Sequence, residues 1–199
     1  MELKLFEVGP TRSARVRWTL LELGVPFTSV EGAHLFGSPE LRAVSPLGKV
    51  PVLVVDGRPL LESAAICTWL ADRHPEQGLV APSGTWERAL HDQWVAFCLA
   101  EFEAHLWSTA RNTFIYPEER RCTSVLAQNE AEGRRALAVL DAHLADRPFM
   151  LGERLTVTDI IVGYATSWAV NEGWAEACPH VTAYTGRLRA MPRCPYTAR

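Results

Sequence analysis

The segment 47–65 constrains the fold of this chain more than any other, because it predicts a hairpin that leads directly into a helix. Proline cannot donate to a sheet ladder, so Pro51 belongs at the start of a strand over 52–55. Asp56-Gly57 lies between two apolar runs and is a strong signal for a two-residue hairpin turn. Ser63 then precedes an apolar run with helical spacing, and we expect it to be the N-cap of that helix.

Two features of this segment suit a small peptide ligand that carries a carboxylate. If the bond between Val50 and Pro51 is cis, the amide and carbonyl of Val50 face outward, where the backbone of a ligand can pair with them. The free amides and the dipole at the start of the helix after Glu62 attract anions. The alternative is an ordinary hairpin that enters a helix, with Glu62 and Ser63 serving only as a cap.

Two short motifs resemble the glutathione-binding signature of the cytosolic glutathione transferase superfamily. They are Gly48-Lys49-Val50-Pro51 and Leu61-Glu62-Ser63-Ala64-Ala65-Ile66. The resemblance runs from about Leu3 to Tyr196 and implies an α/β, thioredoxin-like N-terminal domain followed by an all-α C-terminal domain. It also implies a set of glutathione-binding residues, with the Val50 backbone on the cysteinyl part and Ser63 on the γ-glutamyl carboxylate. This set is Lys49, Val50, Pro51, Glu62 and Ser63.

Composition and charge exclude several other classes of protein. The 199 residues are 48% hydrophobic and carry a formal net charge of −3, and the Lys and Arg residues are scattered, which argues against nucleic acid as the main partner. No apolar run approaches ~18 residues, so we expect no membrane span, and the N-terminus lacks the apolar core of a secretory signal. The five cysteines are odd in number and form no Cys-x-x-Cys pair, which predicts neither a metal site nor a disulfide framework and favours a reducing cytoplasm.

The order of strand and helix signals predicts two domains. Signals for strands and helices alternate over 1–78 in the order βαβ then αββα, which is the thioredoxin-like order. Gly, Pro and Ser gather in a linker at 79–84. From 85 to 199 every periodic segment is helical. In that half we expect helices at 86–111, 118–146, 156–170 and 179–191.

The start of the third of these helices carries a capping signal. Thr156 and Asp159 stand in capping-box positions, with Asp in place of the usual Glu or Gln, and Leu155 and Ile160 are spaced as a hydrophobic staple. The pattern resembles the N-capping box of the family's core C-terminal helix. We therefore expect Asp159 to hold the fold rather than touch a substrate, and its replacement by Ala to cost about 1–2 kcal/mol.

The resemblance places the residue that activates the glutathione thiol between the first strand and the first helix, within 9–18. No tyrosine or cysteine lies there, which leaves Thr11 and Ser13 and indicates a bacterial Ser/Thr-type enzyme. A free thiol titrates near pH ~8.5, and lowering that pKa by about two units takes roughly 2.7 kcal/mol. One charge-assisted hydrogen bond and a helix N-terminus can supply that much. Thr11 is the first candidate because it lies nearer the strand, and Ser13 is the second because it could be a plain N-cap.

The resemblance also implies that a small hydrophobic electrophile binds on the first helix of the C-terminal half. Trp107 and Arg111 lie one turn apart on one face of that helix, and Tyr116 follows, so these three are the candidate substrate pocket, although most aromatic residues on a helix belong to the core. We expect a cytoplasmic, homodimeric detoxification enzyme that conjugates the glutathione thiolate to such electrophiles, with glutathione as co-substrate and no metal. The alternatives are a glutathione-dependent disulfide or peroxide reductase and a non-catalytic member that binds proteins.

Overall fold

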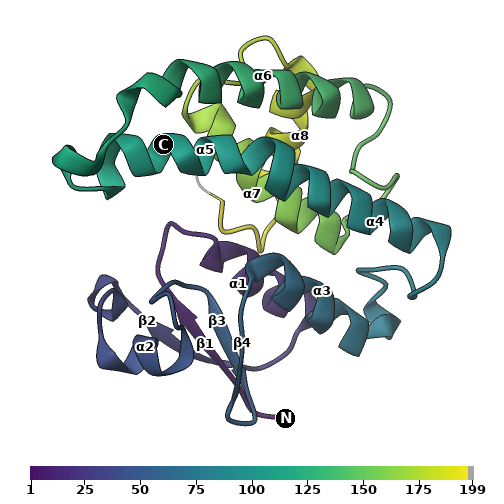
Figure 1. Cartoon of the computed structure of the whole chain (residues 1–199). Helices are drawn as coiled ribbons and strands as arrows, with labels where there is room; N and C mark the ends of the chain where they lie inside the picture. The colour runs from purple at the N-terminus through teal and green to yellow at the C-terminus, as the bar shows by residue number, and fades with distance from the viewer. Residues whose placement is uncertain (197–199) are drawn as a thin grey trace. The chain divides into compact units, whose positions relative to one another are not determined.

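The computed structural model describes residues 1–196, and the chain divides into two compact units (Figure 1). The first unit comprises Met1–Ser83 together with Pro192–Pro195 of the C-terminal tail. The second comprises Gly84–Met191 and Tyr196 of the tail.

The first unit is built on a mixed sheet with the strand order β2-β1-β3-β4. β1 pairs in parallel with β2 and antiparallel with β3, and β4 pairs antiparallel with β3. Helices α1 and α3 pack against each other on one face of the sheet, and α2 lies on the other (Figure 1). The strands are β1 (Leu3–Glu7), β2 (Thr28–Glu31), β3 (Val52–Val55) and β4 (Arg58–Leu60). The helices are α1 (Ser13–Leu23), η1 (Ala33–Leu35), α2 (Pro39–Val44), α3 (Ser63–Arg73) and η2 (Pro75–Gln77).

Alternation along the strands divides the core of this unit between the two faces of the sheet. Phe6 and Val52 form a buried cluster with Leu35 and Leu41, which belong to η1 and α2. Since successive side chains of a strand point to opposite faces, the neighbouring Leu5 and Leu53, both fully buried, face α1 and α3. The sequence-based expectation of a βαβ then αββα unit is confirmed.

The turn between β3 and β4 is the predicted two-residue hairpin turn. Asp56 and Gly57 both have positive φ, 47° and 81°, as a type I′ turn requires. This turn sets the register in which Val55 faces Arg58 and Leu53 faces Leu60. β3 therefore starts immediately after Pro51, as expected.

The second unit is helical throughout its regular elements, and its first two predicted helices differ in detail from expectation. The predicted helix 86–111 extends to Ile115 but contains two wider, π-helical turns, η3 and η4. The predicted helix 118–146 begins only at Leu126, because Arg121 has an extended backbone and the Asn112 side chain accepts the Cys122 amide at 2.8 Å. The elements are α4 (Trp86–Phe97), η3 (Cys98–Phe102), α5 (Glu103–Ala110), η4 (Arg111–Ile115), η5 (Glu118–Arg120), η6 (Thr123–Val125), α6 (Leu126–His143), α7 (Val157–Asn171) and α8 (Pro179–Arg189). Within residues 1–196, no helix combines the length and the apolar character needed to cross a membrane.

Asp159 is the buried polar centre of the second unit. One of its carboxylate oxygens accepts the Met150 amide at 2.7 Å and the Tyr184 hydroxyl at 3.1 Å. The other accepts both the amide and the hydroxyl of Thr156 at 2.8 Å. Burial raises the pKa of the Asp159 carboxyl, and the hydrogen bonds act in the opposite direction. The capping box at the start of α7 is confirmed, and Asp159 additionally ties that helix to α8 and to the loop at Met150.

Candidate active site

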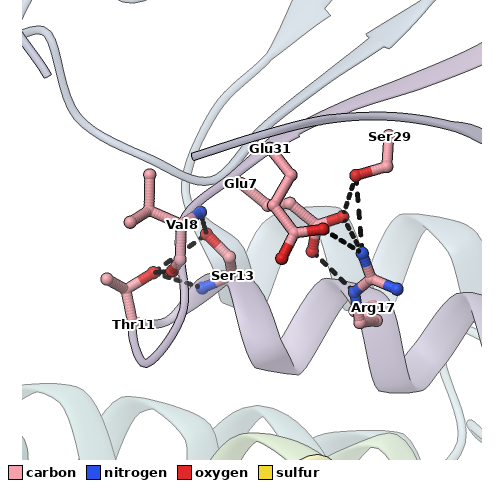
Figure 2. Close-up of polar contacts among 7 residues, drawn as sticks. All are labelled: Glu7, Val8, Thr11, Ser13, Arg17, Ser29 and Glu31. Atoms are coloured by element: carbon pink, nitrogen blue, oxygen red, sulfur yellow. Dashed lines mark hydrogen bonds and ion pairs between the residues drawn. The ribbon is translucent and has the colours of Figure 1, made fainter. Parts of the chain in front are cut away.

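The two candidate hydroxyls lie together where β1 ends and α1 begins (Figure 2). The Thr11 Oγ1 lies 2.5 Å from the Val8 carbonyl oxygen and 2.9 Å from the Ser13 Oγ. The Ser13 Oγ accepts the Val8 amide at 3.3 Å, and the Ser13 amide donates to the Thr11 Oγ1 at 3.2 Å. The two side chains and the end of the strand thus form one closed hydrogen-bonded group.

The two residues that carry these hydroxyls differ in their exposure to solvent. Ser13 is only 2% exposed, whereas Thr11 is half-buried. Ser13 is also the first residue of α1, with Arg12 before it as the N-cap, so Ser13 does not cap the helix. Its hydroxyl instead anchors the Val8 amide to the helix start. Of the two candidates, Thr11 is the one that a thiolate can approach without displacing buried structure.

A partly buried ion pair that sequence reasoning missed holds this strand–helix junction one helical turn further on. The Arg17 guanidinium donates to both oxygens of the Glu7 carboxylate, with Nε at 2.8 Å, and the Ser29 hydroxyl donates to the same carboxylate at 2.6 Å (Figure 2). Glu7 is 4% exposed, and its hydrogen bonds with Arg17 raise the pKa of that guanidinium. The bidentate pair fixes α1 against the end of β1. No local pattern indicates it, because the partners lie on different elements.

The Val50–Pro51 bond is cis, as expected from the sequence. Pro51 is buried and Val50 is half-buried. The sheet register begins at Val52, and within residues 1–196 the amide and carbonyl of Val50 have no backbone partner. Lys49 is exposed, and its amide donates to the Ser45 hydroxyl at 3.0 Å. The Val50 backbone is therefore an unpaired edge of the kind that binds an extended peptide.

The start of α3 differs from the expectation in one respect. Glu62, not Ser63, is the N-cap, because the Glu62 carbonyl accepts the first helical hydrogen bond, from the Ile66 amide, at 2.9 Å. Glu62 is exposed and has a φ of 66°, a conformation that non-glycine residues rarely adopt and that clusters at ligand-binding sites. No side chain caps the helix, so the amides of residues 63–65 have no partner in the described chain. Such amides form an anion site.

The Ser63 hydroxyl is positioned by Arg15, through a contact between α1 and α3 that the sequence did not predict. Ser63 is 6% exposed, and its Oγ accepts a hydrogen bond from the Arg15 Nη1 at 3.3 Å. Arg15 lies on α1 and is completely buried. Since the Ser63 oxygen accepts from Arg15, its own proton is available for a second acceptor, such as a carboxylate bound at the start of α3.

The three predicted pocket residues of the second unit are also brought together. The Arg111 guanidinium carbon lies 5.8 Å from the centre of the Trp107 ring and 5.9 Å from that of Tyr116. The π-helical turn η4 closes with the Tyr116 amide donating to the Arg111 carbonyl at 2.9 Å. This wide turn returns Tyr116 to the face that carries Arg111, which an α-helical turn would not do at a spacing of five residues.

None of the cysteines lies at the β1–α1 junction. Cys67 is buried on α3, and its burial raises the pKa of the thiol to about 12, although the Thr19 side chain and the Arg15 charge lower it. Cys98 and Cys178 are also buried, whereas Cys122 is exposed. A thiol with so high a pKa is protonated and unreactive at neutral pH.

We therefore expect Cys122 to be alkylated first when the folded protein is treated with iodoacetamide, and Cys67 only after unfolding. Mass spectrometry of the digested protein, with and without urea, measures both sites. Rapid modification of Cys67 in the native protein would contradict the assignment of that thiol as a buried, neutral group.

The comparisons with known proteins identify the family. Residues 11–78 match the family model described as glutathione S-transferase, N-terminal domain, and residues 123–187 match the corresponding C-terminal domain. Glutathione S-transferase GstA of Escherichia coli O157:H7 is 30% identical over 196 residues, which cover 96% of this chain and 94% of GstA. The chain belongs to the glutathione S-transferase family.

Two further relatives of this glutathione S-transferase family member bear on its function. Probable elongation factor 1-gamma 2 of Arabidopsis thaliana is 32% identical over 166 residues, which cover 78% of this chain but only 38% of that protein. The theta class glutathione S-transferase of Xanthomonas axonopodis pv. citri, solved with glutathione bound, has a TM-score of 0.79 and 29% identity and covers 98% of this chain and 96% of that one. The superfamily and the fold expected from the sequence are thus confirmed, whereas the Ser/Thr-type subclass stays a prediction.

Proposed function

We propose that this family member binds glutathione in its first unit and conjugates the glutathione thiolate to small hydrophobic electrophiles. The observation that carries the proposal is the half-exposed Thr11 hydroxyl at the start of α1, in the same unit as the unpaired Val50 backbone and the uncapped start of α3. The glutathione-bound relative from Xanthomonas axonopodis pv. citri supports the identity of the ligand.

Each part of the tripeptide has a partner of matching chemistry in this proposal. The Val50 amide and carbonyl pair with the cysteinyl part as an added strand would. The γ-glutamyl carboxylate accepts the free amides of α3 and the Ser63 hydroxyl, while the exposed Glu62 carboxylate attracts the adjacent ammonium group. Lys49 contributes positive charge for the glycine carboxylate. Pro51 shapes the edge without donating to it.

The reaction follows from the thiolate that Thr11 stabilises. The thiol loses its proton to solvent, and the Thr11 hydroxyl donates a hydrogen bond to the sulfur. In a conjugation with an aryl halide, the sulfur lone pair forms the new carbon–sulfur bond, and the halide leaves with the electrons of the broken carbon–halogen bond. The electrophile binds at Trp107, Arg111 and Tyr116 of the second unit. The proposal also includes that the protein is a cytoplasmic homodimer with a role in detoxification.

Isothermal calorimetry of glutathione binding tests the first half of the proposal. We expect Ser63→Ala to weaken binding about tenfold, because one hydrogen bond to the γ-glutamyl carboxylate is lost. Ser83→Ala is the matched control, since Ser83 is exposed and lies outside the proposed site. Absence of glutathione binding at millimolar concentration contradicts the proposal altogether.

Turnover distinguishes the enzymatic alternatives. Conjugation of 1-chloro-2,4-dinitrobenzene supports the transferase, whereas reduction of hydroxyethyl disulfide in its place supports a glutathione-dependent disulfide reductase. The half-buried Thr11, with no cysteine at that junction, favours the transferase.

A second candidate is a non-catalytic member whose fold binds another protein. It is favoured by the relatives named elongation factor 1-gamma, in which the similar segment is part of a longer protein. Glutathione binding without turnover of any electrophile or disulfide would favour this candidate.

A further inference from the structure

Three guanidinium groups gather around Tyr116. The Arg111 and Arg120 guanidinium carbons lie 5.9 and 5.5 Å from the centre of the Tyr116 ring, and the Arg121 Nε donates to the Tyr116 carbonyl at 2.8 Å. Within residues 1–196, none of the three forms an ion pair. Other arginines of the same unit do, namely Arg134 with Glu130, Arg135 with Glu132 and Arg147 with Asp146.

Arg111 is the most under-satisfied member of this cluster. Among the described residues its Nε is buried without a hydrogen-bond partner, and its guanidinium makes one long hydrogen bond there, 3.5 Å from Nη1 to the Tyr116 hydroxyl. Buried donors are normally paired, and leaving one unpaired destabilises the fold. A half-buried guanidinium with free donors and no counter-ion is therefore prepared to accept an anion.

The surroundings of Arg111 specify what kind of anion fits. The Trp107 and Tyr116 rings flank the guanidinium, and Phe114 and Ile115, which precede Tyr116 in η4, are 64% and 44% exposed. An aromatic ligand can lie on this apolar surface while its charged substituent pairs with the guanidinium. A small inorganic anion would leave the aromatic surface unused.

The arrangement is held by hydrogen bonds of the buried Asn112 side chain. The Asn112 side-chain amide nitrogen donates to the Ser108 carbonyl at 2.9 Å, and its oxygen accepts the Cys122 amide at 2.8 Å. These bonds fix the loop that carries Arg120 and Arg121 against the end of η4. Little ordering is then required when a ligand binds.

We propose that Arg111 selects electrophiles in which an aromatic ring carries an anionic group, such as a carboxylate or sulfonate, and that Arg120 adds positive potential. The step itself is unchanged: the thiolate displaces a halide from the ring, the halide leaves with the bonding electrons, and the anionic substituent remains on the product. The selection of a reacting substrate rests on the proposed function, whereas the binding of an aromatic anion does not.

A matched pair of electrophiles tests the selection. 4-Chloro-3,5-dinitrobenzoate and its methyl ester have the same leaving group and differ in the negative charge, and each rate is divided by the uncatalysed rate with glutathione. We expect Arg111→Gln to lower the ratio of kcat/KM for the acid to that for the ester tenfold or more, because a charge-assisted hydrogen bond is lost. Arg111→Lys keeps the charge but not the planar fork, so it should restore part of the ratio. Arg135→Gln, on exposed α6 surface, should leave the ratio unchanged.

Direct binding separates failure of this proposal from failure of the proposed function. Without glutathione, the unreactive 3,5-dinitrobenzoate should bind more tightly than its methyl ester by calorimetry, and Arg111→Gln should abolish the preference. Binding of the acid by a protein that does not bind glutathione would overturn the proposed function and leave this site standing. Equal affinity for acid and ester, or a ratio unaffected by Arg111→Gln in a variant with the wild-type urea midpoint, overturns the assignment of Arg111.

Discussion

Replacing Thr11 by Val should raise the pKa of enzyme-bound glutathione by about one to two units, because the helix N-terminus still stabilises the thiolate. At pH values below the wild-type pKa, kcat/KM for the electrophile should fall about 10- to 100-fold. Valine has nearly the same shape as threonine but cannot donate a hydrogen bond to the sulfur. Because the thiolate loses this donor, its protonated form becomes relatively more stable. The rate should therefore recover tenfold for each unit by which the pH is raised, until the new pKa is passed.

The ultraviolet absorbance of the thiolate, titrated with glutathione bound, measures the pKa directly. The pH profile of kcat/KM for the electrophile, at saturating glutathione, measures the same pKa through turnover. Thr11→Ser restores a hydroxyl at the same position and should restore most of the activity. If both titrations give the wild-type pKa for Thr11→Val, another group activates the thiol.

Ser13→Ala is the matched control at the same junction. The Ser13 Oγ accepts the Val8 amide, so its removal leaves a buried amide unpaired and should destabilise the fold by about 1–3 kcal/mol. Since Ser13 is 2% exposed, we expect the pKa of bound glutathione to change little. A large increase in that pKa for Ser13→Ala, with none for Thr11→Val, would reverse the roles assigned to the two residues.

The Thr11 hydroxyl must reorient when a thiolate is bound. A hydroxyl has one proton, and in this structure the Thr11 Oγ1 lies 2.5 Å from the Val8 carbonyl. To donate to sulfur, the O–H bond must turn away from the carbonyl, either by rotation of the hydroxyl or by rotation of the side chain to another staggered position. The Ser13 amide, which donates to the same oxygen, strengthens its hydroxyl as a donor.

The parts of the site that lie on local sequence signals could be predicted, and those that depend on distant contacts could not. Pro51 and the Asp56-Gly57 turn act through their own backbone preferences, so the hairpin followed from the sequence. The positions of Arg15 and Arg17 did not, because their partners, Ser63 and Glu7, come from other elements of the first unit. Single residues of this kind leave no periodic pattern.

The predicted helix boundaries were wrong where side-chain contacts or an unusual backbone conformation override local preference. We expected the segment 118–125 to be part of a long helix, yet Arg121 is extended and the Cys122 amide donates to the Asn112 side chain, which leaves only the short turns η5 and η6 before Leu126. The Ser63 assignment failed because Glu62 adopts a positive φ, which no sequence rule indicates for a glutamate. Both differences lie beside the proposed ligand sites, where a departure from local preference is expected to have a functional role.

Asp159→Ala should lower the free energy of unfolding by about 3–5 kcal/mol, well above the 1–2 kcal/mol expected for a lost cap alone. The carboxylate accepts the backbone amides of Met150 and Thr156 and the hydroxyls of Thr156 and Tyr184, and Asp159 is fully buried. In Asp159→Ala these four donors lose their acceptor, and because the site is buried, water cannot take its place. Urea unfolding followed by far-ultraviolet circular dichroism measures the loss. Asp146→Ala is the control, since that carboxylate is 74% exposed and its pair with Arg147 should contribute little.

Asp159→Asn tests whether the acceptors themselves, rather than the filled volume, stabilise the second unit. Asparagine fills the same space, but one of its two terminal atoms becomes an NH₂ group, which donates instead of accepting. The hydroxyls of Thr156 and Tyr184 can rotate to adapt, whereas the amides of Met150 and Thr156 cannot, and each faces a different carboxylate oxygen. Whichever way the asparagine is turned, one backbone amide therefore meets an NH₂ group. The variant should be less stable than the wild type and more stable than Asp159→Ala, and wild-type stability would mean that packing alone accounts for the role of Asp159.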